Sequence, residues 1–141
     1  MQKITQEEII NFCHQNSVIN FLGVKAVPIE NGEVRLELFV GERHTNPYGL
    51  LHGGVMSTLV DTAMGAACLA KNKKVVTISM TVEFMKAFPV HTKILTDAKV
   101  THDGRKILFC ECKLLDAEGT VYAKANATFY VIGTFQDEGE N

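Results

Sequence analysis

The most apolar stretch of the chain, residues 55–70, predicts a long central helix. Almost every side chain in it is apolar or small, so this helix must be buried on nearly all sides. The few polar residues are spaced to form one narrow stripe along the helix. The stripe consists of Ser57, Thr58, Asp61 and Thr62. Asp61 is its single ionisable residue, and a buried carboxylate is costly unless it is paired or has a chemical role.

Alternation of apolar and polar residues predicts strands on both sides of this helix. Residues 33–40 alternate cleanly and form the expected first strand. Asp103-Gly104 is a typical tight-turn sequence between two later strands. The four later strands are expected as a meander over residues 76–84, 90–101, 106–115 and 120–132.

The N-terminal segment predicts a short amphipathic helix over about residues 6–15, because Thr5-Gln6-Glu7-Glu8 has the capping-box pattern. The apolar segment 17–27 is consistent either with a short helical turn or with a segment that closes over a pocket. Lysines in 71–74 suit the end of the central helix, where we expect solvated capping. The tail from about residue 134 to 141 is polar and acidic and is expected to be disordered.

The order of these elements predicts an α+β fold, with a curved antiparallel sheet wrapped around the long central helix. A chain of 141 residues is expected to form a single domain over 1–141. The outer face and edges of such a sheet need protection, so we expect the chain to associate with copies of itself.

Composition excludes several classes of function. The net charge is −2 and there is no lysine-rich arm, which argues against nucleic-acid binding. The N-terminus has no signal-peptide pattern, and Asp61 interrupts the longest apolar stretch, so we expect a cytoplasmic protein without a membrane span. The four cysteines lack metal-ligand or redox spacing, and we interpret them as small buried hydrophobic residues.

The entrance of the central helix is a candidate site for acyl chemistry. Gly53 and Gly54 have no side chains, so a ligand can approach the backbone N–H groups of the first turn, which stabilise negative charge. Asp61 lies seven residues after Gly54, or roughly 10 Å along the helix axis. Reacting groups must come within about 3–3.5 Å of each other. If Gly54 and Asp61 act on one substrate, they must therefore come from two chains of a dimer.

The segment Asn46-Pro47-Tyr48-Gly49-Leu50-Leu51-His52-Gly53-Gly54, followed by Asp61, resembles the motif of hotdog-fold acyl-CoA thioesterases. The resemblance covers roughly residues 17–132 and is strongest to phenylacetyl-CoA and 4-hydroxybenzoyl-CoA thioesterase-like proteins. It implies hydrolysis of acyl-CoA without a cofactor or metal, in a homodimer with shared sites or a homotetramer built from two dimers.

The resemblance also implies a role for individual residues. The Gly54 N–H would polarise the thioester carbonyl, and Asp61 of the facing subunit would be the general base or the nucleophile. Asn46 and His52 would place the carbonyl and order the loop, and Thr77 would orient the attacking water. The residues implied to bind the substrate and its coenzyme A arm are Gly53, Phe84, Met85, Lys86, Ala87, Arg105 and Lys106.

Alternatives remain open at the level of the sequence. His52 and Thr77 could be structural, and the lysines and arginine could be solvated turn charges. The domain could bind acyl-CoA without cleaving it, or act as a hydroxyacyl dehydratase, although Asp61 has no convincing histidine partner on its own element. The acyl group, whether aryl, short or long, and the choice between general-base and anhydride routes are not determined.

Overall fold

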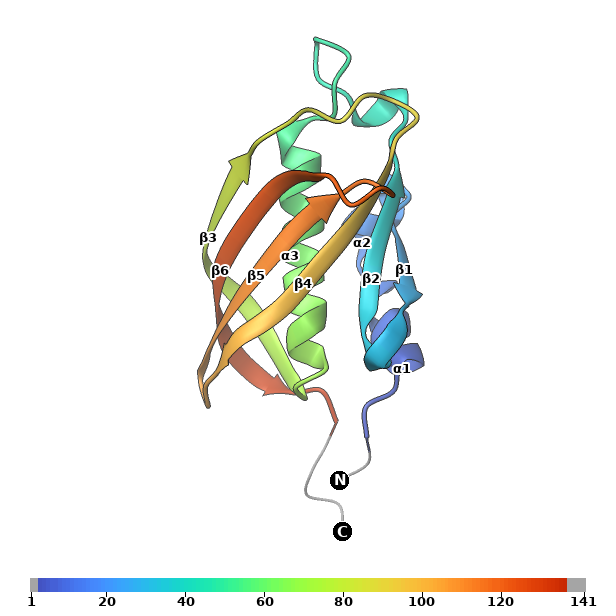
Figure 1. Cartoon of the computed structure of the whole chain (residues 1–141). Helices are drawn as coiled ribbons and strands as arrows, with labels where there is room; N and C mark the ends of the chain where they lie inside the picture. Colours follow the sequence, from blue (N-terminus) through green and yellow to red (C-terminus); the bar gives the residue numbers. More distant parts are fainter. Residues whose placement is uncertain (1–2, 137–141) are drawn as a thin grey trace.

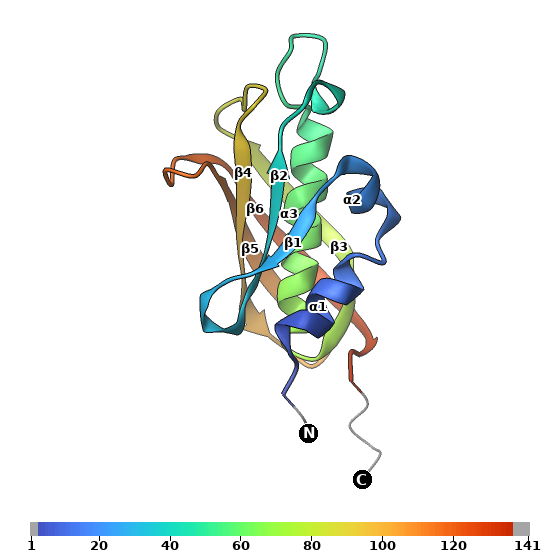
Figure 2. The same ribbon diagram turned by 90° about the vertical axis from the view of Figure 1, so that its right-hand side faces the viewer.

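A computed structural model describes residues 3–136 and shows one curved sheet folded around a central helix (Figure 1). This helix, α3 (Gly53–Leu69), lies against the concave face of the sheet. Two shorter helices, α1 (Gln6–Cys13) and α2 (Ser17–Leu22), lie beside it at the β1 side of the molecule (Figure 2). Single 3₁₀ turns, η1 (Glu30–Gly32) and η2 (Glu42–His44), flank the second strand.

All neighbouring strands of the sheet pair antiparallel, in the order β1-β2-β4-β5-β6-β3. This arrangement confirms the predicted α+β fold with a curved antiparallel sheet around the long helix. The strands are β1 (Lys25–Pro28), β2 (Val34–Phe39), β3 (Lys73–Phe84), β4 (Lys93–Asp103), β5 (Ile107–Leu115) and β6 (Val121–Thr134).

The predicted four-stranded meander is wrong in one respect. Only β4, β5 and β6 follow one another in space, whereas β3 lies at the far edge of the sheet and pairs with β6. The chain leaves β3, crosses the end of the molecule and enters β4 beside β2 (Figure 1). Alternation along a strand determines which face each side chain occupies, but it does not determine which strands become neighbours.

The N-terminal segment differs from the prediction in two places. The helix α1 ends at Cys13, two residues earlier than expected, although Thr5 caps it through the Glu8 N–H at 3.1 Å. The apolar segment after it contains the short helix α2, which confirms the helical interpretation, but also β1, which the sequence did not indicate. Gly23 ends α2 in the left-handed conformation, with φ of 78°. A strand of four residues is too short to show a clear alternation.

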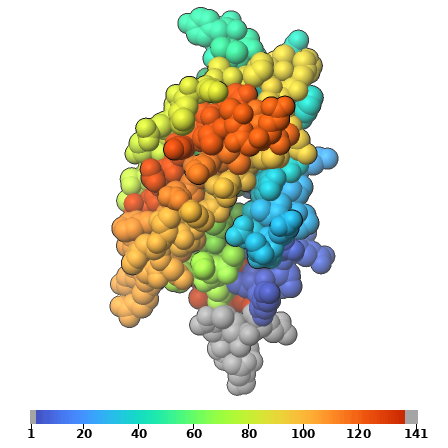
Figure 3. Space-filling view, viewed as in Figure 1, coloured from blue at the N-terminus to red at the C-terminus, as the bar shows by residue number. Residues whose placement is uncertain are grey.

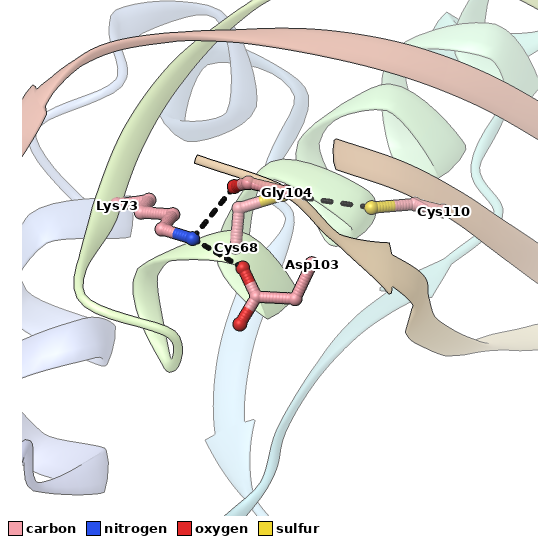
Figure 4. A network of polar contacts seen from close by, with 5 residues as sticks. All are labelled: Cys68, Lys73, Asp103, Gly104 and Cys110. Carbon is pink, nitrogen blue, oxygen red and sulfur yellow. Dashed lines mark hydrogen bonds and ion pairs between the residues drawn. The ribbon is translucent and has the colours of Figure 1, made fainter. Parts of the chain in front are cut away.

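The connection from α3 to β3 is held by polar contacts rather than left in solvent. The Lys73 ammonium contacts the Asp103 carboxylate and donates to the Gly104 carbonyl at 2.8 Å (Figure 4). Lys73 and Lys74 both belong to β3, so the interpretation of these two lysines as solvated helix capping was wrong. The short connection let the strand begin earlier than its alternating pattern suggested.

The C-terminal end of β6 also extends past its predicted limit, through Thr134. Phe135 then packs edge-on against Phe12, with ring centroids 5.3 Å apart. Gln136 donates its backbone N–H to the Asn72 side chain at 2.6 Å. These contacts contradict the start of the expected disordered tail near residue 134, and its remainder, 137–141, lies outside the described residues.

The core lies between α3 and the sheet, and all four cysteines are buried in it with free thiols. This confirms their interpretation as small apolar residues. Burial raises the pKa of Cys13 to about 11 and that of Cys112 to about 12, so both thiols stay protonated at neutral pH. Cys68 and Cys110 join α3 to β5, with sulfur atoms 3.5 Å apart (Figure 4).

The wall around α3 is incomplete between β2 and β4, which pair only over three residues of each strand. Part of the C-terminal half of α3 is visible through this opening (Figure 3). A cavity of about 440 Å³ lies there, bordered by Ala66 and Ala67 of the helix and by Ala70, which follows it. Asp61 does not line this cavity.

Across residues 3–136, no helix combines the length and hydrophobicity needed to cross a membrane.

Candidate active site

The loop before α3 is ordered by the side chain of Asn46. Its carboxamide oxygen accepts the backbone N–H groups of Tyr48 at 2.9 Å and Leu50 at 3.1 Å. Gly49, at φ of 77°, supplies the left-handed residue that this tight loop needs. Asn46 therefore orders the loop that leads into the helix.

His52 is the N-cap of α3, and its Nδ1 atom accepts the Gly54 N–H at 2.8 Å. The N–H that the sequence analysis treated as free therefore has an acceptor in this single chain. A Cβ atom at Gly54 would lie 3.0 Å from the His52 ring, so the glycine permits this close capping contact. Both residues are exposed, so the imidazole has room to turn away from the helix.

Asp61 and Thr77 meet between α3 and β3. The Thr77 hydroxyl donates to the Asp61 carboxylate, with 2.6 Å between the oxygen atoms. A bulge in the pairing of β3 with β6 lies directly after Thr77. A bulge interrupts the regular alternation of side chains between the two faces of a strand. Here the interruption lies between Thr77 and Ser79, directly after the residue that contacts Asp61. The structure thus brings together two residues that the sequence placed sixteen positions apart.

The polar stripe of α3 is only partly covered in the single chain. Ser57, Thr58, Asp61 and Thr62 are all half-buried, while the opposite side of the helix is fully buried. Gly54 and Asp61 are seven residues apart, just under two helical turns, so both lie on nearly the same side of α3. Within one chain they remain about 10 Å apart along the axis.

The segment that follows β3 lies beside the start of α3. Phe84 approaches Gly53 so closely that a Cβ atom on the glycine would lie 3.5 Å from its ring. The Met85 and Lys86 N–H groups both donate to the Tyr122 carbonyl, at 2.9 and 3.0 Å, which fixes this segment against β6. The side chains of 84–87 are exposed. The candidate substrate-binding residues Gly53, Phe84, Met85, Lys86 and Ala87 therefore form one cluster.

The other candidate coenzyme A contacts, Arg105 and Lys106, lie in the turn between β4 and β5. This turn is fastened to Lys73 at the start of β3, next to the C-terminal end of α3 (Figure 4). Within one chain, these two cations are therefore at the opposite end of the central helix from Lys86. The structure does not bring the two predicted groups of contacts together.

Comparison with known proteins places this arrangement in a family. A model described as the thioesterase superfamily matches residues 48–123, more than half of the chain. The chain belongs to the thioesterase superfamily. The matched segment runs from the loop ordered by Asn46, through α3 and its stripe, into β6. This confirms the family that the sequence motif resembled and its class as a thioesterase enzyme.

Relatives in both sequence and structure agree with this assignment. A protein of Saccharolobus solfataricus, named provisionally as an esterase, is 30% identical over 131 residues and covers 91% of each chain. Human acyl-coenzyme A thioesterase 13 is 32% identical over 108 residues, covering 74% of this chain and 75% of its own. The E. coli PaaI structure has a TM-score of 0.82 at 18% identity, covers 93% of this chain and 98% of its own, and supports the hotdog fold alone.

One feature of the site was missed by sequence reasoning. The His52 contact with the Gly54 N–H gives the histidine a defined structural role in the single chain. The signal was present, because the residue directly before a helix commonly caps its first turn through its side chain. Histidine is not among the usual capping residues, so the pattern His-Gly-Gly did not suggest it.

Proposed function

We propose that this protein hydrolyses acyl-CoA thioesters to a free carboxylic acid and coenzyme A, with Asp61 as general base or nucleophile. The observation that carries the proposal is the 2.6 Å hydrogen bond between Thr77 and Asp61 in a half-buried polar stripe. It is supported by acyl-coenzyme A thioesterase 13, and by the Streptococcus mutans smu.793 structure bound to acetyl CoA. That structure is 27% identical, has a TM-score of 0.73, and covers 79% of this chain and 90% of its own.

The reaction needs a nucleophile at the thioester carbon and a partner for the developing oxyanion. In the general-base route, Asp61 takes a proton from water, the hydroxide oxygen bonds to the carbonyl carbon, and the thiolate of coenzyme A leaves. In the alternative route, the carboxylate attacks directly and water cleaves the resulting anhydride. Thr77 serves either route, because its hydroxyl donates to Asp61 and can still accept a hydrogen bond from water.

The Gly54 N–H of a partner chain would receive the carbonyl oxygen. Two α3 helices that lie antiparallel about a two-fold axis near residues 57–58 would place Gly54 of each chain beside Asp61 of the other. The polar stripe, which the single chain leaves half-exposed, would then be covered by its own copy. The geometry of one helix, with both groups on nearly the same side, supports this shared site in a dimer.

His52 must then give up its contact with the Gly54 N–H when the substrate binds. The imidazole lies at the exposed end of the helix, so its rotation displaces no core residue. Asn46 would keep the loop in shape meanwhile, through its own two hydrogen bonds. We assign His52 to capping the empty site rather than to proton transfer.

The coenzyme A arm would lie against the cluster formed by Gly53 and residues 84–87, with Lys86 near its phosphates. Arg105 and Lys106 could reach the same nucleotide only from another chain, because they lie at the other end of α3. This requirement favours a homodimer, or a homotetramer, over a single chain. We propose no metal or redox cofactor, and the four free cysteines favour a reducing compartment such as the cytoplasm.

The proposal is tested by following thiol release from a panel of acyl-CoAs with a thiol-reactive dye. Hydrolysis of at least one thioester, abolished in Asp61→Asn, is the expected result. Tight binding of an acyl-CoA without thiol release would instead indicate a non-catalytic binding protein. Hydration of an enoyl-CoA, followed by loss of its absorbance, would indicate a dehydratase.

The shared site has its own test in a mixed dimer. Asp61→Asn and Gly54→Val chains carrying different tags are co-expressed, and the mixed dimer is purified through both tags. One of its two sites receives both defects and the other receives neither, so about half of the wild-type activity is expected. A folded mixed dimer that is no more active than either parent would place both groups in a single chain.

A further inference from the structure

A pocket of about 260 Å³ starts at Asp61 and Thr77 and follows α3 toward its C-terminal end. Because it begins at the proposed base, it is the natural place for the group attached to the thioester carbonyl. Its walls come from α1, α3, β3, β6 and Asn16 before α2, and are mostly apolar. Beyond Asp61 and Thr77, the lining residues are Phe12, Cys13, Asn16, Thr62, Gly65, Ala66, Leu69, Lys74, Val75, Phe129 and Ile132.

Gly65 provides much of the free width of this pocket. It lies four residues after Asp61, so it is on the same side of the helix one turn further along. A Cβ atom built on Gly65 would meet no atom within 4 Å, which shows open space beside its backbone. Glycine within a helix is unfavourable compared with alanine. Within residues 3–136, no packing contact requires a glycine here, so the space itself is the feature that the glycine provides.

Phe12 lines the pocket beside Lys74, toward the C-terminal end of α3. Its ring packs edge-on against Phe135 at 5.3 Å, and the Lys74 ammonium lies 5.6 Å from the ring centroid on its face. These contacts fix the ring, so α1 acts as a wall rather than a movable flap. The pocket is slightly smaller than the roughly 300–1,000 Å³ of cavities that hold drug-sized ligands.

We infer that this pocket selects compact apolar acyl groups, with Gly65 setting the width and Phe12 the length that it accepts. The inference rests on the proposed thioesterase function and names its substrate class. Acyl groups of one ring, or of a medium chain, fill the apolar walls. A long unbranched chain would have to displace the Phe12 ring from both Phe135 and Lys74.

Gly65→Leu tests the width directly, because a Cβ atom at this position projects into the open space of the pocket. We expect the ratio of kcat/KM for phenylacetyl-CoA to that for acetyl-CoA to fall by at least about tenfold, since single methylene groups in such pockets change specificity by this much. Ala70→Leu is the matched control. It adds the same branch at an exposed position of the helix end that does not line this pocket, and the ratio should stay at its wild-type value.

Two further variants keep the inference testable if Gly65→Leu does not fold. Gly65→Ala favours the helix and should lower the ratio in the same direction, by a smaller factor. Phe12→Ala should raise the kcat/KM for palmitoyl-CoA relative to hexanoyl-CoA. An equal fall for all thioesters in the Gly65 variants would overturn the inference. Absence of thiol release by the wild-type protein from every thioester would instead overturn the proposed function.

Discussion

The two sides of α3 differ in their surroundings: one is buried in the core and the other carries the half-exposed polar stripe. One side carries Met56, Leu59 and Met64 into the core, where none is more than 3% exposed. The other carries the polar stripe, whose residues are half-exposed and make specific contacts, such as the bond from Thr77 to Asp61. Both sides belong to one rigid element, so the core side holds the stripe in position. The helix can therefore be nearly all apolar and still present a carboxylate with a defined geometry.

Substitutions on the two sides should affect different quantities, activity on one side and stability on the other. A substitution in the stripe is expected to lower kcat while the buried side keeps the helix in place. A substitution on the buried side lowers the free energy of unfolding while the remaining folded molecules keep their site. Two substitutions on α3 test this separation, and two beside the site sharpen it.

The largest effect is expected for Asp61→Asn. The amide keeps the size of the side chain, and its oxygen can still accept from Thr77, but it cannot act as a base or nucleophile. We expect kcat to fall by at least about 10²-fold, with thermal stability little changed. Thiol release and thermal unfolding of the same preparation measure both quantities. Hydrolysis close to the wild-type rate would make Asp61 a purely structural residue.

Leu59→Ala tests the opposite side of the same helix, because Leu59 is fully buried. Loss of the side chain leaves a cavity in the core, which should lower the free energy of unfolding by about 2–5 kcal/mol. Urea unfolding followed by circular dichroism measures the loss. The kcat of the folded fraction should stay within about twofold of wild type. A fall in kcat as large as that of Asp61→Asn would show that the two sides of α3 are not independent.

Thr77→Val removes the hydroxyl but keeps the shape of the strand residue. If Thr77 orients water and the carboxylate, we expect kcat to fall roughly tenfold, equal to the loss of about 1.4 kcal/mol of transition-state stabilisation. Thr77→Ser, which restores a hydroxyl at the same position, should recover most of the activity. Equal rates for the valine and serine variants would leave Thr77 with a packing role only.

The smallest effect is expected for Lys86→Ala, at the exposed cluster beside the start of α3. Loss of one exposed phosphate contact should raise the KM for acyl-CoA about threefold to tenfold with little change in kcat, because such contacts bind substrate and transition state alike. A pantetheine thioester, which has no nucleotide phosphates, serves as the control substrate. Its KM should not change. Parallel changes for both substrates would exclude a phosphate contact.

Much of the fold followed from patterns that act locally. The stripe on α3, the strand after Asn31-Gly32 and the turn at Asp103-Gly104 were all predicted, because periodicity and turn chemistry depend on neighbours in the sequence. The place of β3 beside β6 was not predicted, since pairing depends on contacts between distant strands. The strand β1 was missed because four residues carry too little pattern.

The site was predictable in its parts but not in its contacts. The sequence placed Gly54 and Asp61 on one helix and gave their separation, which follows from helix geometry alone. It identified Thr77 through a family resemblance, but the 2.6 Å bond to Asp61 required the strand to be placed. The capping of Gly54 by His52, and the distance between Lys86 and the turn that holds Arg105, became visible only in three dimensions.

The contact between His52 and the Gly54 N–H has a consequence for how binding energy is used. In the proposed reaction, a substrate carbonyl would replace the imidazole as the acceptor of this N–H, so the ground-state complex would gain little from this donor. As the carbonyl oxygen becomes negative, it turns into a much stronger acceptor than the imidazole that it replaced. In the proposed mechanism, the gain would appear only in the transition state, where it would accelerate the reaction instead of tightening substrate binding. If Gly54 has the proposed role, a donor that is already occupied in the empty enzyme would favour turnover over affinity.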